Sequence, residues 1–108
     1  MRLHPRPFER IKNGEQVIES RLNDEKRQQI KVGDHIVFGL RPDFIEKMEV
    51  EVTELLHAAS FLELFRLRPQ AEFGIEGSIE EGANIMREYY SEEEEEKCGV
   101  LGIKFKLL

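Results

Sequence analysis

The stretch that decides the fold is Lys47-Met-Glu-Val-Glu-Val-Thr53, in which apolar and polar side chains alternate strictly. In an extended chain its methionine and valines point to one face, and its glutamates and threonine point to the other. This alternation predicts a β-strand with one buried and one solvated face, as in an antiparallel sheet. The last residues repeat the pattern, because four apolar residues of Leu101–Leu107 share one face. They predict a strand that ends the chain.

Outward from these two segments, helices and further strands are expected. Pro5–Gly14 predicts a short helix that ends at the glycine, and Gln16–Leu22 and His35–Leu40 predict strands. Three capping boxes predict helix starts in the second half, namely Ser60-x-x-Glu63, Ser78-x-x-Glu81 and Ser91-x-x-Glu94. The helices expected after them are Phe61–Leu67, Ile79–Tyr90 and a short acidic helix. We interpret Glu92–Glu96 as the solvated first turn of this acidic helix, where the helix dipole favours negative charge.

The mixture of elements predicts an α+β fold. The connections are too short, and the strands alternate too clearly, for a doubly wound parallel sheet. A curved or barrel-like sheet of about five strands with three or four short helices around it is expected. With 108 residues, the chain has the length of a single domain that spans residues 1–108.

The charge distribution is uneven. The formal net charge is -6, which argues against broad wrapping of a phosphate backbone. Residues 1–31 nevertheless carry a local charge of +3, whereas residues 32–108 carry -9. One cysteine, three scattered histidines and no long apolar run give no reason to expect a disulfide, a metal site, a cofactor or a membrane helix. A cytoplasmic protein is the expectation.

The densest polar constellation lies in this basic front. Glu19 and Arg21 are two residues apart on the predicted strand, so they share one face. They form either a structural ion pair or a fork of donors beside a base. Gln16 has the opposite parity unless it still belongs to the turn after Gly14. Lys26 follows in a polar turn. The alternative interpretation is that Lys26 is only a solvated charge of this turn.

These residues resemble the ASCH domain family, whose hallmark is Gly-x-Lys-x-x-Glu-x-Arg. The chain carries Gly14-x-Gln16-x-x-Glu19-x-Arg21, with glutamine in place of the lysine. Further similarity extends over almost the whole chain, in Met1-Arg-Leu-His-Pro-Arg-Pro-Phe8, Asp24-Glu-Lys-Arg27, Gly33-Asp34, Ser60-Phe-x-Glu-Leu-Phe65, Tyr89-Tyr90-Ser91 and Gly99-Val-Leu-Gly-Ile103. The resemblance implies a barrel-like fold related to the PUA domain and a cleft, lined by the motif, that binds RNA or a nucleotide.

From the resemblance, the expected binding residues are Gln16, Glu19, Arg21, Lys26, Arg27 and His4. The three basic side chains at 21, 26 and 27 are expected on phosphate, and Gln16 and Glu19 on a base or sugar. Tyr89 and Tyr90 are candidates to stack on a base. Helical spacing with Met86 places at least one of the two tyrosines in the core.

Two alternatives belong to other functional classes. Some small bacterial proteins of the family are amidohydrolases that remove the acetyl group of 4-acetylcytidine, and ribonuclease activity is proposed for others. In the amidohydrolases the motif lysine is catalytic, and a hydroxyl residue replaces the glutamate. If this chain is an enzyme, Glu19 is the expected base and Arg21 the expected stabiliser of negative charge. The third possibility is a protein-interaction domain whose acidic surface binds a basic partner.

Overall fold

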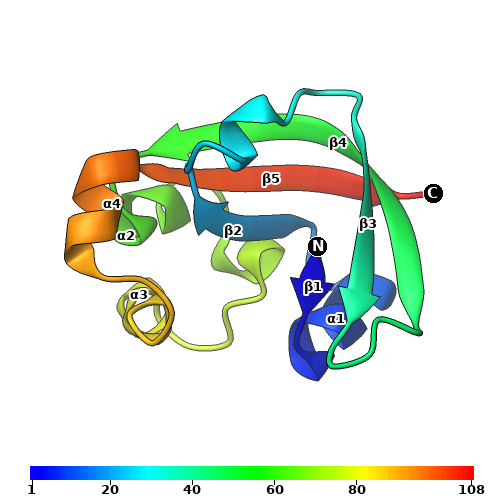
Figure 1. Ribbon diagram of the computed structural model, residues 1–108. Helices are drawn as coiled ribbons and strands as arrows, with labels where there is room; N and C mark the ends of the chain where they lie inside the picture. Colours follow the sequence, from blue (N-terminus) through cyan, green and yellow to red (C-terminus); the bar gives the residue numbers. More distant parts are fainter.

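A single curled sheet of five strands organises the structure, which is a computed structural model describing residues 1–108 (Figure 1). Across the sheet, the strands follow the order β1 (Arg2–Leu3), β3 (His35–Leu40), β4 (Lys47–Ala58), β5 (Val100–Leu107) and β2 (Ile18–Leu22). β1 is parallel to β3, and every other pair is antiparallel. The predicted α+β class with a curved sheet of five strands and short helices is therefore confirmed.

The C-terminal strand β5 lies between β4 and β2 and is buried on both faces. Leu101, Ile103 and Phe105 point into the curl of the sheet, as the alternation predicts. On the opposite face, Gly102 lies against Leu64, and a Cβ at this glycine would come within 3.1 Å of it. The strand therefore carries an apolar cluster on each side, which explains why its alternation is less polar than that of Lys47–Thr53.

Helices cover the two ends of the sheet separately (Figure 1). α1 (Pro5–Lys12) closes one end with Phe8 and Ile11, which pack against Phe38 and Phe105. The other end is covered by elements from the second half of the chain, which are α2 (Phe61–Phe65), the 3₁₀ turn η2 (Gln70–Phe73), α3 (Ile79–Met86) and α4 (Glu92–Cys98). A further 3₁₀ turn, η1 (Arg27–Gln29), lies between β2 and β3.

Several boundaries differ from those expected. The clean alternation covers only Lys47–Thr53, but β4 continues to Ala58, because the pairing with β5 goes on past a register shift between Val52 and Glu54. α3 ends at Met86, four residues before the predicted end. The short elements β1 and η2 were not predicted, since two extended residues or one turn give no periodic pattern.

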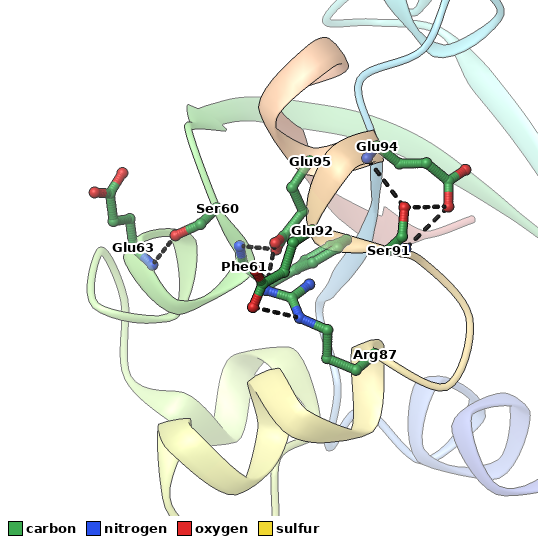
Figure 2. A network of polar contacts seen from close by, with 8 residues as sticks. All are labelled: Ser60, Phe61, Glu63, Arg87, Ser91, Glu92, Glu94 and Glu95. Carbon is green, nitrogen blue, oxygen red and sulfur yellow. Dashed lines mark hydrogen bonds and ion pairs between the residues drawn. The ribbon is translucent and has the colours of Figure 1, made fainter.

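All three capping serines accept a hydrogen bond from the expected backbone N–H, and Ser78 and Ser91 form complete capping boxes. The acidic run after Ser91 is not wholly solvated, which corrects the interpretation of Glu92–Glu96. Glu95 is only 4% exposed. Figure 2 shows its carboxylate accepting from the Phe61 N–H at 2.9 Å and pairing with Arg87 at 2.5 Å. One glutamate therefore joins the starts of α2 and α4 to the end of α3.

None of the helices combines the length with the apolar composition that spanning a bilayer requires.

Glu95→Ala should destabilise the fold, since it leaves a buried N–H and the Arg87 guanidinium without their shared acceptor. We expect the free energy of unfolding to fall by about 2–3 kcal/mol, measured by urea denaturation. Glu93→Ala, at an exposed position of the same helix, is the matched control and should stay within about 0.5 kcal/mol of wild type. Equal loss in both variants would show that Glu95 has no special structural role.

Candidate functional site

Arg21 connects the two edges of the curled sheet. Its guanidinium donates to the carbonyl oxygen of Arg2 at 3.1 Å and to the Glu19 carboxylate at 3.0 Å. Arg2 lies on edge strand β1, whereas Glu19 and Arg21 lie on the opposite edge strand β2. The two motif side chains share a face, as the strand parity predicts, and both are largely buried. The hydrogen bond to Arg2 therefore links β2 to β1, the two edge strands of the curled sheet (Figure 1), and Glu19 holds the guanidinium that makes it.

Gln16 lies before β2 and outside the strand, so its parity no longer separates it from Glu19. Its side chain donates from Nε2 to the Ile18 carbonyl at 3.0 Å and is buried. Its backbone N–H donates to the carbonyl of Arg10 on α1 at 3.2 Å. The glutamine also fills the space beside Gly74, where a Cβ would collide with the Gln16 amide and where φ is +76°. Gln16 thus joins α1, β2 and the end of η2.

The motif borders a cleft of about 770 Å³. One wall comes from β1 and α1, and the other comes from residues 73–77, α3 and the segment after it. Two aromatic rings from these walls lie beside each other, since the His4 and Tyr89 centroids are 6.0 Å apart with the ring planes tilted by 40°. His4 precedes α1 as its N-cap, and Tyr89 follows α3. The cleft therefore combines buried polar groups of the motif with aromatic side chains on both sides.

Of the sequence-predicted binding residues, Gln16, Glu19, Arg21 and His4 line this cleft, and Lys26 and Arg27 do not. Arg27 is paired with Asp24 at 3.2 Å where η1 begins. Burial, followed by the charges of Arg21, Lys26 and Arg27, lowers the pKa of the Met1 amino group. Four of the predicted binding residues therefore line the cleft. Lys26 and Arg27 lie outside the cleft lining, and their charges act on the Met1 amino group.

The two tyrosines have different environments. Tyr90 stacks on Phe61 with a centroid distance of 5.6 Å and packs against the apolar cluster of α2. Tyr89 is 55% exposed and lines the cleft. The expectation that at least one tyrosine belongs to the core is met by Tyr90, which packs on the apolar cluster although it also lines the cleft, and Tyr89 is the more exposed of the two rings.

Sequence reasoning missed four arginines of the cleft wall. They are Arg2, Arg6, Arg10 and Arg41. Arg6 and Arg10 are four residues apart on the predicted short helix, and this spacing indicates that they share one face. No sequence pattern could have indicated Arg41, which follows β3. It reaches the cleft only because β1 pairs with β3 in parallel.

An ion-pair bridge spans the cleft between its walls. Glu76 contacts Arg10 at 2.6 Å and Arg6 at 2.7 Å. The hydrogen bond from Arg10 is the main reason that the pKa of the Glu76 carboxyl lies below its usual value, and the charge of Arg6 acts in the same direction. Two arginine side chains of α1 are therefore already matched by a carboxylate from the opposite wall.

The lysine nearest to the motif does not replace the missing motif lysine. Lys12 pairs with Glu46 at 3.1 Å and does not line the cleft. Its hydrogen bond to Glu46 raises the pKa of Lys12, so the side chain stays protonated near neutral pH and offers no free amine as a base or nucleophile. No lysine lines the cleft, and no three His, Cys, Asp or Glu side chains are grouped to hold a metal ion.

Comparison with known proteins covers the whole chain. The family model of the ASCH domain matches residues 1–108. The crystal structure of hypothetical protein PH0355 is 37% identical, with a TM-score of 0.88, over 100% of this chain and 96% of the other. The solution NMR structure of protein PF0455 from Pyrococcus furiosus is 34% identical, with a TM-score of 0.72, over 100% and 98% of the two chains. No curated protein matches.

The family model matches the full length of the chain, and both solved structures overlap with it almost completely. The arrangement of Gln16, Glu19 and Arg21 at one cleft agrees with these matches. This chain belongs to the ASCH domain family.

Proposed function

We propose that this protein binds RNA or a nucleotide in the cleft around Gln16, Glu19 and Arg21. The observation that carries the proposal is the convergence of three motif residues with two neighbouring aromatic rings in one cleft. The cleft volume of about 770 Å³ lies within the range of roughly 300–1,000 Å³ that small-ligand sites occupy. Membership of the ASCH family supports the same class of ligand.

The lining supplies the contacts that a nucleotide needs. The exposed ring of Tyr89, with His4 opposite, offers a stacking surface for a base, and stacking on aromatic side chains is the usual way in which unpaired bases are held. The Glu19 carboxylate accepts hydrogen bonds. The Gln16 amide spends one N–H on Ile18 and keeps its carbonyl oxygen for a further donor. Base-edge or sugar contacts are the natural role of this pair.

The charge of the lining differs from that of the molecule. Five arginines and three glutamates border the cleft of a protein whose net charge is -6. A local excess of positive charge in an acidic protein attracts an anion to one place and disfavours binding along a long backbone. A single nucleotide or a short single strand therefore fits better than a duplex.

The site offers little for amide hydrolysis by the route that the family's lysine enzymes use. Gln16 occupies the lysine position, and its amide neither gives nor takes a proton near neutral pH. Glu19, the remaining base candidate, is paired with Arg21 at 3.0 Å. We therefore place binding before catalysis.

Tyr89→Ala should weaken the binding of a labelled single-stranded RNA about tenfold, because it removes the exposed stacking surface. The measurement is fluorescence anisotropy at low and at moderate salt, where wild-type affinity should also fall as counterion release weakens. Tyr89→Phe keeps the ring and should bind as wild type does. Tyr89 is a cleaner probe than Arg21, whose removal also breaks the brace between β1 and β2.

Ile45→Ala, at a side chain 80% exposed and outside the cleft lining, is a second control and should leave affinity unchanged. Unchanged affinity in Tyr89→Ala would contradict base stacking in the cleft. Failure of the wild type to bind RNA and all four ribonucleotides would contradict the proposed function.

The wild-type protein should release no acetate from 4-acetylcytidine, because no lysine lines the cleft to act as base or nucleophile. Product analysis by liquid chromatography over several hours is the measurement. Gln16→Lys returns the missing amine to the motif and is the informative variant beside it. Turnover by the wild type would contradict the assignment of a binding role and would make Glu19 the first residue to test.

A further inference from the structure

Two pairs of arginines line the cleft, and only one of the pairs has a carboxylate partner. Arg6 and Arg10 share the carboxylate of Glu76. Arg2 and Arg41 form no ion pair, and both residues are exposed. We propose that Arg2 and Arg41 form the phosphate-binding subsite of the cleft, so that its ligand is a phosphorylated nucleotide and not a free nucleoside. This inference rests on the proposed function and names the part of the ligand that the arginines recognise.

The backbone fixes these two arginines beside each other. Arg2 pairs with Gly39 in the parallel register of β1 and β3, and Arg41 directly follows β3. The Arg41 N–H donates to the Leu3 carbonyl at 2.9 Å. Together with Pro42, the two arginines also line a second hollow of about 220 Å³, so they border both the cleft and its extension. Two guanidinium groups therefore project from adjoining backbone positions at the cleft's edge.

The motif itself positions this subsite. Arg21 donates to the carbonyl of Arg2, so the same side chain that closes the sheet also holds the backbone of the first subsite arginine. Glu19, Tyr89 and the two arginines line the same cleft, so one nucleotide can place its base near the first two and its phosphate on the arginines.

The chemistry of the two pairs decides between them. Guanidinium groups bind phosphate oxygens through paired N–H donors, and two of them match the charge of a phosphate dianion. At Arg6 and Arg10, a phosphate would first have to displace Glu76, which holds both side chains at 2.6–2.7 Å. At Arg2 and Arg41 there is no carboxylate to displace. The unopposed pair is therefore the subsite, and the other pair is a strap between the cleft walls.

NMR titration tests the phosphate-binding subsite directly. The measured quantities are the affinities for the four ribonucleosides and for their 5′- and 3′-monophosphates. At least one monophosphate should bind the wild type about tenfold more tightly than its nucleoside. In Arg2→Gln/Arg41→Gln this advantage should disappear while nucleoside affinity stays the same. Both side chains are exposed, so the variant should keep the wild-type spectrum elsewhere.

Two further variants separate the alternatives. Arg66→Gln removes an exposed arginine outside the cleft and should change neither affinity. Glu76→Gln frees Arg6 and Arg10, and under this proposal it leaves the monophosphate advantage nearly unchanged. A large gain in Glu76→Gln with no loss in Arg2→Gln/Arg41→Gln would overturn the proposal and assign the phosphate to Arg6 and Arg10. Equal wild-type affinity for nucleosides and monophosphates would also overturn it.

Pyrophosphate and RNA complete the test. Pyrophosphate carries no base and should shift the side-chain signals of Arg2 and Arg41, which supports the subsite even if no base binds and the proposed function fails. Absence of these shifts, with nucleosides still bound, would reject the subsite alone. With single-stranded RNA, loss of one neutralised phosphate should reduce the salt dependence of log K by about 0.7, which identifies an internal phosphodiester as the bound group. An unchanged slope with the monophosphate effect intact identifies a terminal phosphate.

Discussion

The hydrogen bond from the Arg21 guanidinium to the Arg2 carbonyl is the contact on which the arrangement of the site depends. The five strands do not close into a full barrel, and the two edge strands β1 and β2 do not pair with each other in the order β1-β3-β4-β5-β2. Arg21 reaches from one edge to the other and is held in place by Glu19. Without that contact, the wall built from β1 and α1 would have no direct polar link to the strand that carries the motif. The structural and the functional interpretation of this ion pair are therefore compatible.

A consequence of this brace is that the motif residues stabilise the cleft more than they form its exposed lining. Gln16, Glu19 and Arg21 each spend at least one bond on the backbone or on another motif residue. The groups with free polar or aromatic surface come from other elements, namely Tyr89 after α3, Arg2 on β1 and Arg41 after β3.

A similar division appears among the acidic residues of the second half of the chain. Glu76, Glu95 and Glu72 are paired with arginine or lysine side chains, which removes part of the acidic surface that the local charge of -9 suggests.

Local sequence patterns predicted the fold well where one physical effect dominates over several residues. Alternation located β3, the first half of β4 and β5, and the three serine caps located the starts of α2, α3 and α4. Prediction failed where a distant partner decides. β4 continues past Thr53 only because β5 keeps pairing with it, and β1 exists only because β3 lies alongside. Glu95 looked solvated because the N–H of Phe61, which it accepts from, lies 34 residues away in sequence.

The site divides in the same way. The sequence by itself determined that Glu19 and Arg21 share a face, since side chains two apart on a strand must do so, and it determined the excess of basic residues near the motif. Only the tertiary structure decided that Gln16, His4 and Tyr89 join them, that Lys26 and Arg27 stay outside, and that Arg6 and Arg10 are neutralised while Arg2 and Arg41 are not. The reason is physical: strand periodicity acts between neighbours, whereas the pairing of charges and the walls of a cleft depend on which distant segments the sheet brings together.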